Sequence, residues 1–218
     1  MTKNLKEIVT ILDRFKGESL TKTIASIEEE AEGLAAEDCE ALLATAHAEP
    51  EVLEAAAELK RLADQVDVII HAVGILLCLP RILEAGETVE SLSLGAGNTG
   101  RSFDLETNLR VAEFKFTRWR GGPETIRQNE TFKDFYLLAA NPTQKRKQLF
   151  LLGTQHAEKF FRGERALESV LSTNKKVREK FFGQFDKRFR TVGDYYAVEK
   201  GKVEITDMSR WVKELKPV

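Results

Sequence analysis

The spacing of apolar residues in this chain changes near Pro80, and that change limits the folds the chain can adopt. Before this point apolar residues recur every three or four positions, as at Leu5, Ile8 and Leu12, which is typical of amphipathic helices. After it apolar and polar residues alternate, as over residues 88–94, which is typical of half-buried strands. A helical first part followed by strands and further helices predicts an α/β fold.

We expect two parts, a helical extension over residues 1–65 and an α/β domain over residues 66–218 with a mixed central sheet flanked by helices. The extension either offers a surface for a homodimer or a partner protein, or simply covers one side of the domain. The elements expected in the domain are a helix over 66–79, strands over 88–95, 101–106 and 110–119, a helix over 123–140, a strand over 147–153, a basic helical stretch over 164–190 and a tail hairpin made of 195–198 and 203–205.

The composition favours a cytoplasmic protein without a membrane span. The start of the chain is polar and mixed in charge, which does not resemble a signal peptide. The most apolar stretch, residues 66–80, is shorter than the roughly 20 residues that cross a bilayer, so we expect a buried helix there. Two isolated cysteines, Cys39 and Cys78, argue against a disulfide framework or a zinc site.

The charge is divided unevenly along the chain. Residues 1–100 carry 8 Lys and Arg against 19 Asp and Glu, whereas residues 101–218 carry 25 against 16. A basic half of this kind favours a polyanionic partner, because Lys and Arg neutralise the phosphates of nucleic acid. Solvated charged faces on both halves are the other interpretation of the same numbers.

A glycine-rich segment, Gly95–Gly100, has the spacing of dinucleotide-binding loops. Such a loop needs a helix directly after it, so that the pyrophosphate meets the helix N-terminus. Here a second strand follows, so we interpret the segment as a turn.

Two alternating segments, 102–106 and 110–119, predict a hairpin that turns at Thr107-Asn108. If Leu105 pairs with Arg110, Asp104 lies opposite Val111 and on the same face as Glu113 and Lys115. The residues expected on the other face, against the core, are Phe103, Leu105, Ala112, Phe114 and Phe116.

Two carboxylates beside an amine suit the hydrolysis of phosphodiesters. Asp104 and Glu113 would hold Mg²⁺ or Mn²⁺, and the backbone carbonyl of Phe114 would be a further ligand. Such a metal lowers the pKa of a bound water and neutralises charge in the transition state. Lys115 would orient that water or help to deprotonate it.

This pattern resembles the PD-(D/E)xK nuclease superfamily, which has the restriction-endonuclease-like fold. The resemblance covers roughly residues 66–155 and rests on Phe103-Asp104, on Glu113-Phe114-Lys115 nine positions later, and on the order of elements. The proline that usually precedes the aspartate is absent. The resemblance implies that Asp104 and Glu113 are metal ligands, that Lys115 is the catalytic lysine and that Gln128 on the next helix is a further catalytic residue.

Basic residues around this hairpin are candidates for contacts with phosphates. Trp119 would either stack on a base or pack in the core, and His156 is more typical of a surface or capping residue than of a general base. The candidate phosphate-binding residues are Arg118, Arg120, Arg127, Lys145, Arg146 and Lys147.

We therefore expect a metal-dependent nuclease acting on nucleic acid, DNA rather than RNA, in the cytoplasm. A degenerate nuclease fold that binds nucleic acid or protein without cutting is the alternative. A helical regulatory protein whose function lies in residues 1–50 is a third possibility.

Overall fold

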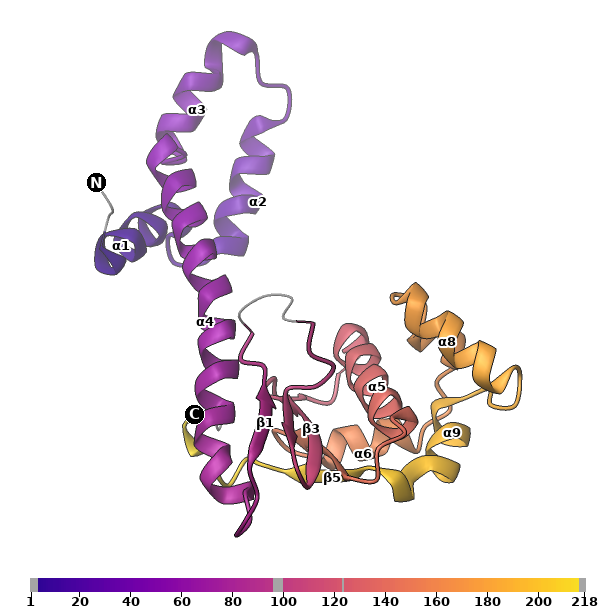
Figure 1. The fold of residues 1–218 in the computed structure, drawn as a ribbon. Coiled ribbons are helices and arrows are strands. Elements are labelled where there is room, and N and C mark those ends of the chain that lie inside the picture. The colour runs from indigo at the N-terminus through magenta and orange to yellow at the C-terminus, as the bar shows by residue number, and fades with distance from the viewer. Residues whose placement is uncertain (1–3, 96–99, 123, 216–218) are drawn as a thin grey trace. The chain divides into compact units, whose positions relative to one another are not determined.

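The computed structural model describes residues 4–95, 100–122 and 124–215. By its internal contacts the chain divides into a first unit, residues 1–67, and a second unit, residues 68–218 (Figure 1). In chain order the elements are α1 (Leu5–Lys16), α2 (Leu20–Ala31), the 3-10 helix η1 (Ala36–Asp38), α3 (Cys39–Thr45), α4 (Pro50–Ile82), β1 (Val89–Leu92), β2 (Leu105–Thr107), β3 (Arg110–Lys115), α5 (Thr125–Ala140), β4 (Arg146–Leu151), α6 (Gln155–Phe161), α7 (Leu167–Val170), α8 (Lys175–Phe185), α9 (Val192–Glu199), η2 (Lys200–Lys202), β5 (Glu204–Asp207) and η3 (Lys213–Leu215).

The first unit is helical, as the three-to-four spacing predicts. Its first helix begins with a capping box, in which the Asn4 side chain accepts from the Glu7 N–H and the Glu7 carboxylate accepts from the Asn4 N–H. Among its described residues, Ile8 and Ala55 are the fully buried apolar side chains. Ile8 lies on α1 and Ala55 on α4, so the buried core of this unit is small.

The second unit contains a five-stranded mixed sheet in the order β1-β2-β3-β4-β5, which confirms the expected α/β class. The first three strands run antiparallel, and β3, β4 and β5 run parallel. Helix α5 makes the connection from β3 to β4, because parallel neighbours need a long crossover. Three adjacent strands therefore end at the same edge of the sheet.

Two clusters of buried apolar side chains lie on the two faces of this sheet. Val111, Leu149 and Leu151 face α5 and the later helices, where 22 buried residues form the larger cluster. Ala112, Phe114 and Phe150 face the second-unit part of α4 and the C-terminal segment. The period-two alternation of β3 and β4 thus sends successive side chains into different cores.

The tail departs from the expected hairpin. Residues 192–199 form the helix α9 instead of a strand, and β5 alone adds to the sheet, parallel to β4. The Thr191 hydroxyl accepts from the Asp194 N–H and the Asp194 carboxylate accepts from the Thr191 N–H, which is a capping box. This helix start outweighs the β-propensity of Tyr195 and Val198.

Helix α4 also differs from the expected buried helix. It is a continuous helix of 33 residues, and by length and apolar composition alone it could cross a membrane, although only 17% of its most apolar window is buried. In the second unit Ile75 and Cys78 are fully buried, while Ile69 and Leu77 are more than half exposed. Residues 96–99, the centre of the glycine-rich segment interpreted as a turn, lie outside the described residues.

Candidate functional site

The register of the hairpin differs from the expected one by two residues. Leu105 pairs with Ala112 and Glu106 with Val111, so the strands are joined at Asn108-Leu109. Because side chains alternate with a period of two, a shift of two residues keeps each side chain on its face. Asp104 therefore remains on the side of Glu113.

Phe103 does not lie on the face expected for it. The chain bends over residues 102–104, just before β2, and Phe103 packs with Val111 in the cluster that faces α5. The bend breaks the alternation that the hairpin pattern assumed, so Asp104 approaches β3 from a loop rather than from a regular strand.

Asp104 is held by groups from two elements. Its Oδ2 accepts a hydrogen bond of 2.9 Å from the backbone N–H of Phe114, and its Oδ1 lies 3.3 Å from Nε2 of His71 on α4. Burial raises the pKa of Asp104, but the hydrogen bonds from His71 and Phe114 outweigh this effect and lower it. Asp104 is consequently a fixed carboxylate with two donors.

The pKa of Glu113 is shifted in the opposite direction to that of Asp104. Burial, followed by the nearby charges of Asp134 and Asp104, raises the pKa of Glu113 to about 10, although Lys115 opposes this shift. Its side chain is hydrogen-bonded to Asp104. At neutral pH the two carboxyl groups therefore share one proton, which Glu113 donates to Asp104.

Lys115 is paired with a residue that the sequence analysis did not select. Its Nζ lies 2.6 Å from Oδ2 of Asp134 on α5, a side chain that is only 4% exposed. Burial lowers the pKa of Lys115, but the charges of Asp134, Glu113 and Asp104 outweigh it and raise the pKa. These contacts favour the ammonium form of Lys115, which suits the expected role of orienting a water better than that of deprotonating it.

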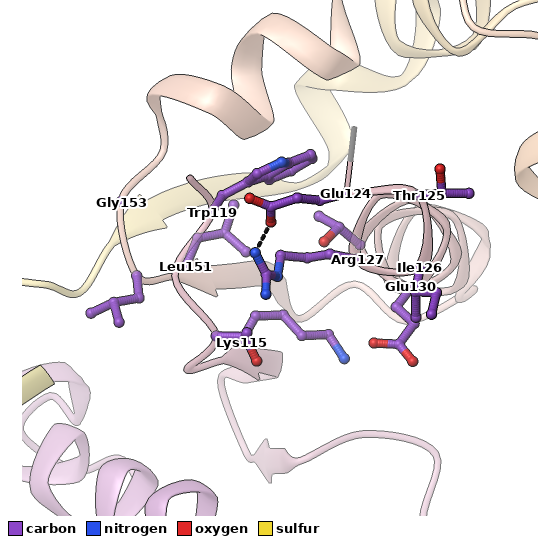
Figure 2. A pocket seen from close by; sticks show the side chains of 12 residues that line it. Lys115, Trp119, Glu124, Thr125, Ile126, Arg127, Glu130, Leu151 and Gly153 are labelled. Atoms are coloured by element: carbon purple, nitrogen blue, oxygen red, sulfur yellow. Dashed lines mark ion pairs between the residues drawn. The ribbon is translucent and has the colours of Figure 1, made fainter. Parts of the chain in front are cut away.

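A cavity of about 570 Å³ opens beside Lys115, between the end of β3 and the first turns of α5. Figure 2 shows Lys115 and Arg127 among its lining side chains, with the ion pair between Arg127 and Glu124. Arg127 also donates to the carbonyl of Arg118 at 2.7 Å. The expected phosphate ligand Arg127 is therefore at the cavity but already paired.

Gln128 does not line this cavity. Its side-chain oxygen accepts a hydrogen bond from the Arg165 guanidinium. The α5 residues that line the cavity include Glu130 and Thr131, and Asp134 is the α5 residue that reaches Lys115. The geometry thus replaces Gln128 by Asp134 as the helix residue of the site.

A second cavity, of about 760 Å³, lies where β4 and β5 end. It is lined by Arg118, Arg120 and His156, and it shares Trp119 with the first cavity. Trp119 is only 8% exposed and packs on Phe160 with ring centroids 5.5 Å apart. Trp119 is therefore a wall of both cavities, and of its two expected roles the structure supports core packing.

The basic triplet Lys145-Arg146-Lys147 lies at the other end of the sheet. Lys145 pairs with Glu90 at 2.6 Å, and Arg146 pairs with Glu84 at 2.5 Å. Lys147 donates to backbone carbonyls at the end of α5. These cations are neutralised and stand at the start of β4, about 17 Å from its far end at roughly 3.3 Å per residue. The expectation that they contact phosphates at the site is not supported.

Two residues of the site were missed in the sequence. These residues are His71 on the apolar helix α4 and Asp134 on α5. A polar residue inside an apolar helical face was the available signal in both cases, since a buried charge needs a partner.

The donor set fits a divalent cation that is bound partly through water. Among the described residues no group of three or more His, Cys, Asp or Glu side chains is arranged as a complete metal site. Mg²⁺, however, is commonly held by one or two carboxylates and keeps several waters. A proton shared by Asp104 and Glu113 marks a place where negative charge exceeds positive charge, and a cation would replace that proton.

Comparison of the chain with protein-family models, with curated proteins and with solved structures found no match.

Proposed function

We propose that this protein is a divalent-metal-dependent nuclease with a restriction-endonuclease-like domain of the PD-(D/E)xK type. The observation that carries the proposal is the buried pair of Asp104 and Glu113, whose side chains are hydrogen-bonded to each other next to the Lys115–Asp134 ion pair. The pair stands where β3 ends, and open α/β sheets bind ligands at the carboxyl ends of their parallel strands.

Asp104 and Glu113 are the residues that would hold Mg²⁺ or Mn²⁺. The Phe114 carbonyl is a third candidate, since the N–H of the same strand residue already points at Asp104 and the two groups of a strand residue face the same side. The metal would supply an acidified water and positive charge against the phosphate.

The other residues of the site act by position and charge. Asp134 holds Lys115 in place, and the Lys115 ammonium would donate to a phosphate oxygen as negative charge develops there. His71 donates to Asp104 and so fixes the direction in which this carboxylate points.

The order of elements supports the proposed fold type. The second unit runs from α4 through three antiparallel strands to α5 and the parallel strand β4, which is the order that the resemblance implies. The helices α6 to α9 and the strand β5 follow after the region covered by the resemblance.

Nucleic acid, with DNA as the first choice, is the proposed substrate. Arg118 and Arg120 line the cavity next to the site, and both are exposed. Helix α8 and the segment after it bury Phe181 and Phe189 and turn a basic face to solvent. The exposed cations of this face are Lys175, Lys176, Arg178, Lys180, Lys187, Arg188 and Arg190. We place the enzyme in the cytoplasm, consistent with Cys39 and Cys78 as free thiols.

Cleavage assays with the full chain test the proposal. Supercoiled DNA, linear DNA, single-stranded DNA and RNA are each incubated with Mg²⁺ or Mn²⁺, and at least one should be cut only when metal is present. Asp104→Asn should lower the rate by about 100-fold or more, as expected for the loss of a charged transition-state group.

The matched control is Glu106→Gln, two positions further along the chain, on β2. Glu106 pairs with Lys145 and is 41% exposed, so this variant should cut like the wild type. Undiminished metal-dependent cleavage by Asp104→Asn would refute the assignment.

One observation favours a non-catalytic nucleic-acid-binding module instead. Glu113 is hydrogen-bonded to Asp104 and Lys115 forms an ion pair with Asp134, so the charged groups have partners without metal. In that case DNA binding would persist in EDTA, and calorimetry would detect no Mg²⁺ binding that depends on Glu113.

A further inference from the structure

Helix α4 exposes a row of apolar side chains in the second unit. The row consists of Ile69, Val73, Leu76 and Leu77, which we call the α4 seam. Their exposed fractions are 58%, 46%, 47% and 51%. Four neighbouring apolar side chains left half in water are a candidate interface, because isolated exposed apolar residues are common but contiguous ones are not.

The opposite side of the same helix is bound to the sheet. Ile75 and Cys78 are completely buried in the cluster that faces α4. Gly74 lies so close to Phe116 that a Cβ atom there would be 2.3 Å from the ring. These contacts fix the rotation of the helix about its own axis, so the α4 seam is a fixed surface.

The spacing of the seam is that of a coiled coil. Ile69, Val73 and Leu76 follow one another at steps of four and three, and in the sequence the same steps extend back through Val66 and Leu62 to Leu59. In heptad terms Val73 takes position a, and Ile69 and Leu76 take position d. Valine at a with leucine or isoleucine at d packs against another helix by knobs into holes.

We propose that the α4 seam pairs with the α4 seam of a second copy of this chain. An a/d seam matches an identical seam, and a two-fold axis through it gives a closed interface in which both copies use the same surface. The positions that flank the seam are Gln65, Ile70, Ala72 and Leu79, none of which is charged. In a pair of identical helices, like charges at these positions would repel each other. Because no charge is present there, such repulsion does not oppose self-pairing.

A lipid bilayer does not fit the same helix, although its composition is apolar enough. The inner face of α4 carries His71 3.3 Å from Asp104, next to the charged site, and lipid cannot surround a helix that packs on such a sheet. Helices that lie on a membrane surface flank their apolar face with Lys and Arg, whereas Asp64 and Asp67 precede the seam here.

The mass of the full chain in solution tests the pairing. At tens of micromolar, light scattering or sedimentation should give twice the 24.6 kDa of one chain. The double variant Ile69→Glu, Leu76→Glu should return to the mass of a single chain. The control Val198→Glu, at a residue on α9 that is 52% exposed, should remain a dimer.

Three results would overturn the proposal: a monomeric wild type, a double variant that stays dimeric, or a wild type that binds phosphatidylglycerol vesicles through the seam. Thermal melts establish that each variant is folded. If the glutamates prevent folding, the milder pair Ile69→Ser, Leu76→Ser replaces them, with the same loss of the dimer expected. The readout is mass, so it is independent of whether the protein cuts nucleic acid.

Discussion

The strand β3 carries a charged cluster at each end, and the two clusters differ in their balance. At its start, the buried Arg110 faces the carboxylate of Glu87. At its end, Lys115 faces Asp134, with Glu113 and Asp104 close by. The first cluster pairs one buried cation with one buried anion. The second gathers the carboxyl groups of Asp104, Glu113 and Asp134 around Lys115, with His71 beside Asp104 and Lys133 3.3 Å from Asp134.

The cluster at the start is satisfied in detail. Arg110 donates to both oxygens of Glu87 at 2.5 Å and to the Gln148 side chain at 2.7 Å. Burial raises the pKa of Glu87, but the bonds from Arg110 and Thr107 outweigh it and lower the pKa to about 2. The Glu87 carboxylate is therefore favoured in its ionised form.

The difference separates a structural cluster from a candidate functional one. The Arg110–Glu87 pair is balanced in charge and hydrogen-bonded, so it stabilises this end of the sheet and leaves no group free to bind a ligand. An unbalanced group of carboxylates must keep a proton to be stable, and Glu113 keeps it. Such an arrangement has a place for an added cation, which the Arg110 cluster lacks.

The largest effect should follow the removal of Arg110. Arg110→Met leaves Glu87 buried without its cation, so the free energy of unfolding should fall by about 3–5 kcal/mol. Urea denaturation measures the change. Arg146→Met is the control, because the Arg146–Glu84 pair is exposed and should contribute about 1 kcal/mol or less.

Acid should weaken the same cluster by a somewhat smaller amount. The pKa of Glu87 is lower in the folded chain than its ordinary 4.5, so the pair stabilises the protein above pH 4.5. This stability is lost as the pH falls from 4.5 through about 2, by on the order of 3 kcal/mol in total. Unfolding titrations of Glu87→Gln should lack this loss, and a variant that keeps the wild-type slope would show that Glu87 is not its source.

The site should respond with the opposite sign. The pKa of Glu113 is raised to about 10, so the wild type loses stability as the pH rises from 4.5 through 10. Glu113→Gln removes this dependence, so its stability relative to the wild type should grow by about 1.4 kcal/mol for each pH unit between pH 6 and pH 8. Thermal melts at pH 6 and pH 8 measure it, with Glu106→Gln as the control.

The effect of Mg²⁺ on the melting temperature gives a further test of Glu113. Under the proposed function, Mg²⁺ binds the folded wild type and should raise its melting temperature, whereas Glu113→Gln should show a smaller rise. Equal stabilisation of both proteins by Mg²⁺ would place the metal elsewhere.

Much of the fold followed from local patterns. The strands expected over 110–119 and 147–153 match β3 and β4, and the helix expected over 123–140 matches α5, with bounds that differ by a few residues. The tail was predicted wrongly, because Tyr195 and Val198 favour strands while the capping box at Thr191 starts a helix. The hairpin register was wrong by two residues, because the two-residue turn lies at Asn108-Leu109 instead of Thr107-Asn108. The Thr107 hydroxyl stabilises this turn by accepting hydrogen bonds from the N–H groups of Leu109 and Arg110.

The spacing of residues along the chain is enough to predict the period of each element, and hence the α/β class. It also predicts that Glu113 and Lys115 share one face, because side-chain direction in a strand depends only on local geometry. Which distant groups contact Glu113 and Lys115 depends on the tertiary structure. His71 arrives from α4 and Asp134 from α5, and both come through packing contacts between residues far apart in the chain. Whether a charge is balanced depends on such neighbours, so the proton on Glu113 and the pairing of Lys145 and Arg146 with acidic partners could not be inferred from spacing alone.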